Sequence, residues 1–260
     1  MASRLNLKGL HRAERHAAPL SGVELFTFES TRDFPRHSHD QYGFGLVLAG
    51  GHKSWSGRGA VEAVAGDVIT VNPGEMHDGA PLGDSARRWR MVYLDVDRLQ
   101  AELADEVSGD VEFAAPRFSD PIVRRRALRL FAADDALSFE AALIAAVEPL
   151  LVRRRPSSGA VPTLRRLRQG IDDDPAQRLS LAEMAAAAGL SRFQLLRAFV
   201  RATGLTPQAY ARQARARLAR RLIRAGMALA EAASAAGFAD QAHMTRALVD
   251  QYAVTPGRLR

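Results

Sequence analysis

The sequence contains no cysteine among its 260 residues. This absence excludes disulfide bonds, thiolate nucleophiles and zinc sites built on cysteine ligands. Proteins that stay in a reducing compartment commonly show this usage. The lack of cysteine therefore favours a cytoplasmic protein.

Long hydrophobic runs are missing as well. The most apolar stretches, such as Ala182–Leu190, are far shorter than the roughly 20 residues that a membrane-spanning helix needs. The first 20 residues carry basic side chains but no apolar segment of the kind found in secretory signals. We therefore expect no membrane association and no secretion.

Lysine is scarce, and the charge is unevenly distributed. Only Lys8 and Lys53 are lysines. From Pro156 to Arg260 the sequence has 16 arginines, no lysine and 7 acidic residues, which gives this segment a net charge of +9. Because the whole chain carries +7, the remainder carries −2. A general preference for arginine explains the lack of lysine but not the asymmetry, which favours a polyanion-binding module joined to a near-neutral domain.

Residues from about 22 to 96 show the pattern of β-structure. Short apolar runs are separated by glycine, proline, asparagine and aspartate, which are turn residues. These runs are Val23–Phe28, Phe44–Leu48, Val68–Val71 and Met91–Val96. Such spacing predicts an antiparallel sandwich or barrel over about residues 20–97.

Helices are predicted from about residue 120 to residue 153. Pro121 suits the first turn of a helix that is capped by Asp120. A second helix, over about 138–152, has an apolar stripe made of Leu143, Ile144, Val147, Leu150 and Leu151. The stripe either packs on the β domain or pairs with its copy in a homodimer, and the pattern fits both.

The stretch that follows is polar and rich in proline, glycine and serine. Such composition is typical of a linker between domains. We therefore expect an N-terminal domain over residues 1–155, a linker over 156–162 and a C-terminal domain over 163–260.

The C-terminal domain contains an internal repeat. Leu181–Leu190 matches Leu229–Phe238 at an offset of 48 residues, and Thr206-Pro207 matches Thr255-Pro256 at an offset of 49. A helix, a glycine turn, a second helix and a Thr-Pro stop therefore occur twice.

Each copy has the features of a helix-turn-helix. An alanine-rich helix ends at Gly189 or Gly237, and glycine readily adopts the left-handed conformation that ends a helix. The next helix begins after an N-cap, Ser191 or Asp240. This arrangement lets the second helix of each copy enter a DNA major groove, which is about 12 Å wide.

The residues early in each second helix are the candidate base readers. Arginine pairs with guanine, glutamine pairs with adenine, and apolar groups contact the methyl group of thymine. Any one of these residues can instead be an ordinary solvated residue, and other arginines can contact phosphates alone. The candidates are Arg192, Phe193, Gln194, Arg197, Gln241, Ala242, His243, Thr245 and Arg246.

A continuous helix is predicted between the two copies, over Ala209–Gly226. Its apolar residues, Tyr210, Leu218, Leu222 and Ile223, should face the two cores, with its arginines outside. Such a spacer would hold the two units at a fixed separation. Both recognition helices could then enter successive major grooves, roughly 34 Å apart.

Residues 163–260 closely resemble the DNA-binding domain of the AraC family of transcription regulators. The resemblance lies in Leu-Ala-Glu-Met-Ala at 181–185, Phe-Val-Arg-Ala-Thr-Gly-Leu-Thr-Pro at 199–207, the arginine-rich spacer, Gly-Phe-Ala-Asp-Gln at 237–241 and Val-Thr-Pro-Gly-Arg-Leu-Arg at 254–260. It implies a double helix-turn-helix that binds double-stranded DNA. The sequence departs from the family pattern at five positions, which predicts a somewhat underpacked second core. These positions are Ala232, Met244, Leu248, Leu259 and Ala253, the last of which replaces a usual glycine.

The β region holds two clusters that resemble the cupin barrel and the effector-binding domain of AraC-type regulators. The first is His-Ser-His-Asp-Gln-Tyr at 37–42, and the second is Gly-Asp at 66–67 followed by Pro-Gly-Glu-Met-His at 73–77. In metal cupins, both histidines of the first motif, a nearby glutamate and the last histidine bind the metal. Here His37, His39 and His77 match, but Gly43 and Phe44 lie where the glutamate belongs.

Three interpretations of these histidines remain open. They can line an effector pocket without a metal, they can hold a divalent ion through His37, His39 and His77, or they can be structural residues at strand ends. The pocket interpretation gives these candidate effector-binding residues: His37, His39, Tyr42, Glu75, His77, Trp89 and Arg90.

The sequence thus predicts an α+β protein of two domains. The first is a cupin-like β-barrel followed by helices, and the second is an all-α domain with two helix-turn-helix units joined by a long helix. The predicted function is sequence-specific transcription regulation under a small-molecule effector. We expect double-stranded DNA as a partner, a homodimer, and contact with RNA polymerase if the protein is an activator.

No nucleophile–base pair is visible in the sequence, so we expect neither catalysis nor a cofactor. Two alternatives are a metal-dependent cupin enzyme fused to a DNA-binding domain, and a DNA-binding protein that needs no effector.

Overall fold

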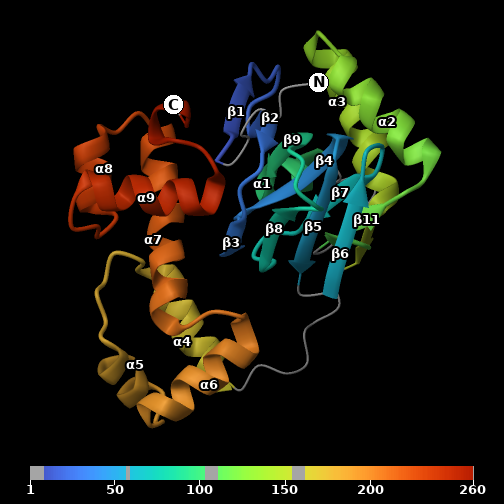
Figure 1. The fold of residues 1–260 in the computed structure, drawn as a ribbon. Helices are drawn as coiled ribbons and strands as arrows, with labels where there is room; N and C mark the ends of the chain where they lie inside the picture. The colour runs from blue at the N-terminus through green and yellow to red at the C-terminus, as the bar shows by residue number, and fades with distance from the viewer. Residues whose placement is uncertain (1–8, 57–58, 103–110, 154–161, 260) are drawn as a thin grey trace, which may run out of the picture. The chain divides into compact units, whose positions relative to one another are not determined.

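The computed structural model describes residues 9–56, 59–102, 111–153 and 162–259 (Figure 1). The chain divides into two compact units, residues 1–155 and 156–260. The first unit is rich in strands and the second is helical, which confirms the predicted fold class. The predicted linker over 156–162 lies outside the described residues except for Pro162, which begins a helix.

The strands of the first unit form two main antiparallel sheets and a small third one. A six-stranded sheet has the order β1-β2-β9-β4-β7-β11, a four-stranded sheet has the order β3-β8-β5-β6, and β10 pairs with β12. The bounds in the six-stranded sheet are β1 (His11–His16), β2 (Val23–Ser30), β9 (Arg87–Asp95), β4 (Gln41–Ala49), β7 (Val68–Val71) and β11 (Arg117–Phe118). The bounds of the others are β3 (Phe34–His37), β8 (His77–Pro81), β5 (Gly51–Ser56), β6 (Gly59–Val64), β10 (Val111–Phe113) and β12 (Leu151–Arg153).

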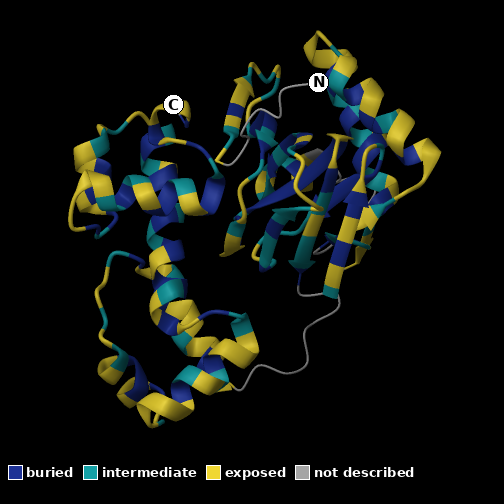
Figure 2. Ribbon diagram, in the orientation of Figure 1, coloured by how far each residue is buried: buried dark blue, intermediate teal, exposed yellow. Residues whose placement is uncertain are grey.

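The two faces of the six-stranded sheet serve different purposes. Because side chains alternate along a strand, Phe44 and Val92 lie on one face, while Trp89 and Met91 lie on the other. The first face belongs to the main hydrophobic core of the unit, which also includes residues of the helices (Figure 2). The other face bears the aromatic residues Phe28 and Trp89, whose rings stack on each other.

Three helices follow the strands or join them: α1 (Val96–Glu102), α2 (Pro121–Ala132) and α3 (Ala136–Val147), with a short 3-10 turn, η1 (Glu148–Leu150), after α3. Asp120 caps α2 as predicted, by accepting a hydrogen bond from the Ile122 backbone, and Pro121 occupies the first turn.

The apolar stripe of the second predicted helix packs on the β domain. Leu143, Val147 and Leu150 are at most 5% exposed and belong to the same core cluster as the strands. These three residues are part of the core of this chain, which favours the first of the two alternatives that the sequence left open, whereas Ile144 of the same stripe is half-buried. The large exposed apolar side chains of α2 and α3 are instead Ile122, Leu128 and Leu137.

The second unit is built from helices that follow the predicted repeat. They are α4 (Pro162–Asp173), α5 (Leu181–Ala187), α6 (Arg192–Thr203), α7 (Pro207–Arg224), α8 (Leu229–Ala235) and α9 (Gln241–Tyr252), followed by the 3-10 turn η2 (Pro256–Arg258). Within the described parts of the chain, every helix is too short or too polar to span a lipid bilayer.

The turns of both helix-turn-helix copies have the predicted geometry. Gly189 and Gly237 have φ angles of 63° and 77°, in the left-handed region that glycine tolerates best. Ser191 and Asp240 are the N-caps of α6 and α9, as predicted, and each accepts a hydrogen bond from the backbone three residues on. The second turn has an added reason for glycine, because a Cβ at Gly237 would lie 2.6 Å from the Ala176 carbonyl oxygen.

Helix α7 is the predicted spacer, and one expectation for it is wrong. Tyr210 and Ile223 are buried as predicted, but Arg220 is only 3% exposed, although the arginines were expected outside. Its guanidinium lies 5.0 Å from the ring centroid of Tyr252 in α9. Both copies pack against α7, so most of its faces are covered and few positions remain for solvated side chains.

Candidate functional site

The first recognition helix, α6, presents its early residues to solvent. Arg192, Phe193, Gln194 and Arg197 are all exposed, while Leu195 is buried beneath them. The Gln194 side chain also completes a capping box, because its Oε1 accepts a hydrogen bond from the Ser191 backbone at 2.9 Å. This bond fixes the orientation of the Gln194 amide at the start of the helix.

Two of these residues form a pair on the exposed face of α6. Phe193 is 66% exposed, and the Arg197 guanidinium lies 5.5 Å from its ring centroid. Residues four positions apart lie on the same side of a helix, so this is a local cation–π contact. An apolar ring beside a fork of N–H donors can contact a thymine methyl and a guanine edge side by side.

In α9 the predicted readers divide into two groups. Gln241, Ala242 and Arg246 are exposed. His243 and Thr245 are half-buried and already have partners. The His243 ring packs edge-on against Phe238, with centroids 5.2 Å apart, and the Thr245 hydroxyl donates to the Gln241 carbonyl at 2.8 Å. The structure therefore leaves Gln241, Ala242 and Arg246 as the residues of α9 best placed for base contact.

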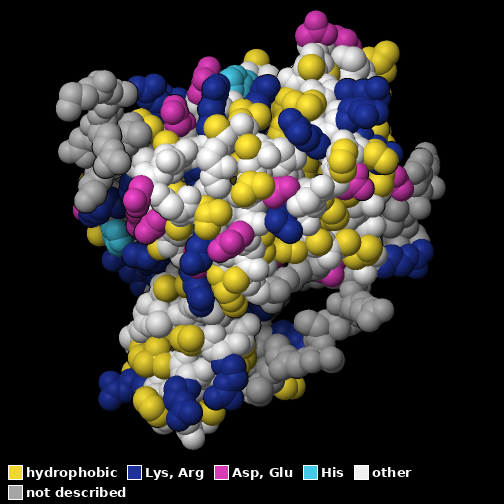
Figure 3. Space-filling view, turned by 45° about the vertical axis from the view of Figure 1, so that its right-hand side comes forward, with side chains coloured by type: hydrophobic (Ala, Val, Ile, Leu, Met, Phe, Trp, Pro, Cys, Tyr) yellow, Lys and Arg dark blue, Asp and Glu magenta, His cyan; other side chains and the backbone are white. Residues whose placement is uncertain are grey.

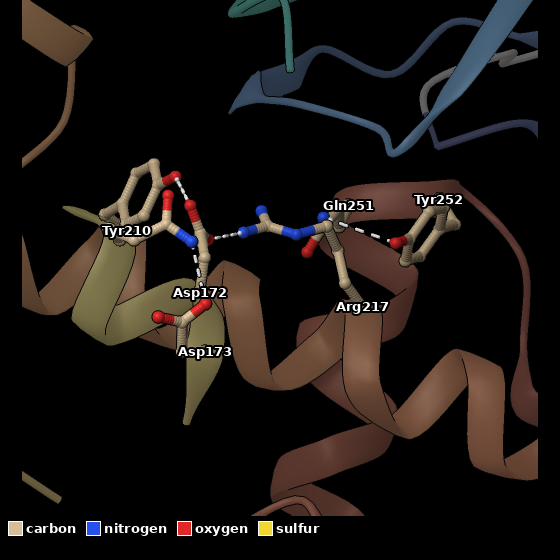
Figure 4. A network of polar contacts seen from close by, with 7 residues as sticks. Asp172, Asp173, Tyr210, Arg217, Gln251 and Tyr252 are labelled. Atoms are coloured by element: carbon tan, nitrogen blue, oxygen red, sulfur yellow. Dashed lines mark hydrogen bonds and ion pairs between the residues drawn. The ribbon is translucent and has the colours of Figure 1, made fainter. Parts of the chain in front are cut away.

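A polar network ties the first copy to the spacer helix. Asp172, near the end of α4, accepts a hydrogen bond from the Tyr210 hydroxyl at 2.7 Å and forms an ion pair with Arg217 at 2.6 Å (Figure 4). Tyr210 and Arg217 both belong to α7. The pKa of Tyr210 is raised by burial and by the neighbouring carboxylate, so its hydroxyl stays a donor at neutral pH.

The loop between α4 and α5 connects both copies. Arg215 of α7 donates to the Pro175 carbonyl at 3.2 Å, and Arg178 of the loop donates to the Gly237 carbonyl at 3.0 Å. Gly237 belongs to the turn of the second copy, so the loop reaches from the first copy across α7 to the second. These hydrogen bonds connect the two copies within the second unit.

Arginine side chains gather on the end of the second unit that carries α4, α5 and α6 (Figure 3). Arg165 and Arg166 of α4 are exposed, and so are Arg192, Arg197 and Arg201 of α6. A positive surface around a protruding helix attracts the phosphate backbone of DNA and supplies affinity that does not depend on sequence.

In the first unit, the three histidines of the cupin-like motifs come together. One ring nitrogen from each of His37, His39 and His77 lies within 4.8 Å of the other two. Their ring centroids are 4.3–5.0 Å apart. His37 and His77 pair across β3 and β8, which explains why motifs 40 residues apart in the sequence meet.

Backbone contacts fix the orientation of two of these rings. His37 Nδ1 donates to the Pro35 carbonyl at 2.7 Å, and His77 Nδ1 donates to the Glu75 carbonyl at 3.0 Å. A neutral imidazole that donates through Nδ1 has a lone pair on Nε2. Burial, reinforced by the neighbouring His77, lowers the pKa of His37 to about 3, and burial also lowers the pKa of His77. Both rings are therefore neutral at pH 7 and can accept a hydrogen bond or bind a metal ion.

The second motif places His77 through its turn. The Glu75 carboxylate accepts hydrogen bonds from the backbone and side chain of Asn72, at 3.1 and 2.9 Å. The Gly74 backbone donates to the His39 carbonyl at 2.7 Å, which fastens the turn to the first motif. Glu75 thus has a clear structural role beside the histidines.

The structure does not bring all of the predicted effector residues together. Trp89 faces the four-stranded sheet, with its ring centroid 6.0 Å from that of His52. Tyr42 lies on the opposite sheet face, in the core, where its hydroxyl donates to the Val111 carbonyl at 2.7 Å. Arg90 lies on that face too, and donates to the Phe131 carbonyl of α2 at 3.2 Å. Tyr42 therefore ties β4 to β10, Arg90 ties β9 to α2, and neither is part of the histidine cluster.

Two residues of the interior were missed at the sequence level, Arg87 and His52. Arg87 is fully buried, and its guanidinium lies 5.0 Å from the ring centroid of Trp89. The alternation along β9 would have found it, because Arg87, Trp89 and Met91 lie two residues apart and share a face. His52 stands between glycine and lysine in a polar strand and gives no such signal.

Comparisons with known proteins agree with both halves of this description. A family model described as an AraC-like ligand binding domain matches residues 22–142, and another described as a helix-turn-helix domain matches residues 184–260. The HTH-type transcriptional regulator YbfI of Bacillus subtilis is 24% identical over 85% of this chain and 86% of its own length. The HTH-type transcriptional regulator MtrA of Neisseria gonorrhoeae is 34% identical, over 35% of this chain and 31% of its own.

Among solved structures, ToxT from Vibrio cholerae shares the fold. Its structure with a bound unsaturated fatty acid aligns with a TM-score of 0.56 at 11% identity, over 93% of this chain and 95% of ToxT. A second ToxT structure, with (E)-4-(8-methylnaphthalen-1-yl)but-3-enoic acid, aligns with a TM-score of 0.52 at 10% identity, over 92% of this chain and 100% of that one.

Proposed function

Since this chain belongs to the AraC family of DNA-binding transcription regulators, we propose that it reads a specific DNA sequence through α6 and α9. One observation carries this proposal. Arg197 and Arg246 occupy matching positions in the two copies, and both are exposed on helices whose opposite faces are buried. Two exposed arginines at equivalent sites suit two base contacts in successive grooves.

The test is a selection of binding sites from random duplexes by the full-length protein, followed by affinity measurements on the selected duplex. Arg197→Ala and Arg246→Ala should each cost about 1–3 kcal/mol of specific binding and relax the preference at one base pair. Arg212 is exposed on α7 and belongs to neither recognition helix, so Arg212→Ala is the matched control and should leave the preference unchanged. A selection that enriches no motif would refute sequence-specific reading.

The effector is proposed to bind in the interior of the first unit, beside Trp89 and the three histidines. The ligand-binding family match and the buried polar cluster support this assignment. ToxT, which shares the fold, has been solved with two organic acids. An effector can control DNA binding only if it binds two arrangements of the protein with different affinities. DNA affinity should therefore change when the effector is added, and an affinity that no ligand alters would favour the alternative without an effector.

We further propose that the protein acts as a cytoplasmic homodimer without catalytic activity, and that it contacts RNA polymerase if it is an activator. The exposed apolar side chains of Leu128 and Leu137, on α2 and α3, support a contact with a second copy. Light scattering at several protein concentrations tests the oligomeric state, and a mass that stays that of one chain would contradict a dimer.

One observation favours a second candidate, the metal-dependent cupin enzyme. His37, His39 and His77 offer three nitrogens, and hydrogen bonds from Nδ1 to backbone carbonyls are typical around metal-ligating histidines. The glutamate of metal cupins is replaced, however, and Phe44 is buried in the core on the other sheet face. Such a set could hold a divalent ion with open positions, which would supply Lewis-acid chemistry. Elemental analysis of the purified protein tests this, and a stoichiometric metal would favour it.

A further inference from the structure

The most heavily buried charge of the first unit is the side chain of Arg87. It is 0% exposed and stands at the start of β9, on the same sheet face as Trp89. Moving a charged group out of water is costly unless an opposite charge or a full set of hydrogen bonds compensates. The partners of this guanidinium therefore decide what the interior can bind.

The chain supplies little compensation for Arg87. Its Nη2 donates to the Arg32 carbonyl at 3.2 Å, whereas Nε and Nη1 have no hydrogen-bond partner among the described residues. Burial lowers the pKa of Arg87 only to about 10, so the group stays charged at neutral pH. A buried cation with unused N–H donors on Nε and Nη1 is suited to an anionic acceptor such as a carboxylate.

The exposed carboxylate of Asp33 lies close enough to raise the pKa of Arg87, so it partly offsets this charge. His52 and Arg87 are neighbours, because both side chains approach Gly79. A Cβ atom added to Gly79 would lie 3.1 Å from His52 Cε1 and 3.6 Å from Arg87 Nη2. Burial, together with the charges of Arg87 and His77, lowers the pKa of His52 to about 3, so His52 is neutral. Because Asp33 is exposed and His52 is neutral, the buried Nε and Nη1 donors of Arg87 remain for a ligand.

Aromatic rings surround the guanidinium. It lies 5.3 Å from the ring centroid of Phe34 and 5.0 Å from that of Trp89. Trp89 stacks on Phe28 with centroids 5.1 Å apart, and Phe28 stacks on Phe26 at 5.5 Å. The cation is thus set against a flat apolar wall, which favours a planar apolar body next to the anionic group.

We propose that the barrel interior binds a small aromatic carboxylate, whose carboxylate group pairs with Arg87 and whose ring lies against Trp89 and Phe28. This inference rests on the proposed effector control and names the chemical class of the effector. The ligand supplies hydrogen-bond acceptors for the guanidinium nitrogens that the described residues leave unsatisfied.

Trp89 is a built-in reporter for the test. The chain has two tryptophans, Trp55 and Trp89, so a Trp55→Phe background leaves Trp89 as the sole fluorophore excited at long wavelength. Phenylacetate should change this fluorescence in a saturable way, and phenylacetamide, which has the same shape without the charge, should not. Arg87→Met should weaken phenylacetate binding roughly 10- to 100-fold, the range expected for lost charge-assisted hydrogen bonds. Arg88→Met, an exposed neighbour on the same strand, is the matched control and should bind as the parent does.

Arg87→Lys keeps the proposal falsifiable if Arg87→Met does not fold. It keeps the charge and loses the fork, so it should bind phenylacetate more weakly while still preferring it to the amide. Equal binding of acid and amide by the parent, no response to phenylacetate, or unchanged affinity in the Arg87→Met protein would each overturn the inference. DNA binding, measured on the same samples with the selected duplex, separates the two ideas. Intact sequence-specific binding without carboxylate binding refutes only the ligand class, whereas carboxylate binding without sequence preference refutes only the DNA reading.

Discussion

At the scale of single residues, the side of the strand decides what a side chain does. Arg87 and Arg90 are three positions apart on β9, so they lie on opposite sheet faces. Arg87 is buried beside Trp89 and lacks partners for two of its nitrogens. Arg90 lies over Phe131 and donates to that residue's carbonyl, so it fastens α2 to the sheet. Two arginines in one strand thus have unrelated roles.

The stability of the first unit should fall as the pH falls, because burial lowers the pKa of His37, His77 and His52, and His52 is the one that lies outside the histidine cluster. Its pKa in the folded chain is about 3, below the ordinary value of 6.5, because of burial and of the nearby Arg87. Between those two values the unfolded chain binds a proton that the folded chain does not bind. The free energy of unfolding therefore decreases below pH 6.5, by about 2 kcal/mol from this one group between pH 7 and pH 5. Urea unfolding followed by tryptophan fluorescence measures it, since both tryptophans belong to this unit.

His52→Gln should remove this share of the pH dependence. The variant's stability between pH 7 and pH 5 should change by about 2 kcal/mol less than that of the parent. His243→Gln, in the other unit, should leave the tryptophan-monitored curve as it is. An identical slope for parent and His52→Gln would mean that His52 is not the group responsible.

A backbone angle in the second copy makes another residue-scale prediction. Ala253 ends α9 with φ at 58°, and among the described residues it is the one non-glycine with positive φ. At the matching position of the first copy, Gly204 ends α6 with φ at 76°. The left-handed conformation costs a residue with a Cβ about 1–2 kcal/mol. Ala253→Gly should relieve that cost and, after the extra entropy of glycine in the unfolded chain, stabilise the second unit by about 0.5–1 kcal/mol.

Thermal unfolding followed by far-ultraviolet circular dichroism checks this prediction. Gly204→Ala imposes the same strain on the first copy and should cost about 1 kcal/mol. If both substitutions shift the midpoint in the same direction, strain at these caps does not explain the difference between the copies.

Sequence reasoning reached these residue roles only in part. The motif spacing brought His37, His39 and His77 together correctly, since the structure places them within 4.8 Å. It could not assign Tyr42, because alternation tells which residues share a face and does not tell which face becomes the core. The strain at Ala253 was visible only as a departure from a family glycine, without its angle.

At the scale of elements, the repeat shows what the second copy lacks. In the first copy Ser180 caps α5 and forms a capping box with Glu183. In the second copy Ala228 occupies the cap position of α8 and makes no side-chain hydrogen bond, although Glu231 stands three residues on. The second copy therefore has the glutamate of the capping box but lacks the capping hydroxyl.

Ala228→Ser should complete the box and stabilise the second unit by about 0.5–1 kcal/mol, the usual value of an N-cap side chain. The measurement is again the thermal midpoint by circular dichroism. Ser180→Ala is the reciprocal control and should cost a similar amount. A midpoint that does not rise in Ala228→Ser would show that the entry into α8 differs from the entry into α5.

The elements differ in how readily the sequence predicts them. Helices α5 to α9 carry glycine turns, caps and apolar spacing, which are local signals, so their positions followed from the repeat. Strands β2, β4, β7 and β9 contain the apolar runs. Strand β5, Gly-His-Lys-Ser-Trp-Ser, and strand β8, His-Asp-Gly-Ala-Pro, have no such alternation and are defined by pairing with each other. Non-local pairing of this kind leaves little trace in one sequence.

At the scale of the whole molecule, side-chain contacts connect the two helix-turn-helix copies of the second unit. Helix α7 has 18 residues and is therefore about 27 Å long. Arg217 and Tyr210 fasten it to α4, and Arg178 fastens the α4–α5 loop to the turn at Gly237. We therefore expect the fold to set the distance between α6 and α9.

A fixed distance between α6 and α9 predicts a strict spacing between the two half-sites on the selected duplex. Inserting five base pairs between them rotates one half-site to the other side of the DNA, so one of the two recognition helices should lose its groove. The affinity should then fall about 100-fold or more, because the second contact is no longer intramolecular. Inserting ten base pairs restores the face of the duplex but adds a full turn, roughly 34 Å, which α7 cannot span. A flexible connection would recover much of the affinity at ten base pairs, whereas a rigid one recovers none. Fluorescence anisotropy with the parent duplex and the two insertions distinguishes these outcomes, and full affinity on either insertion would mean that the two recognition helices bind independently.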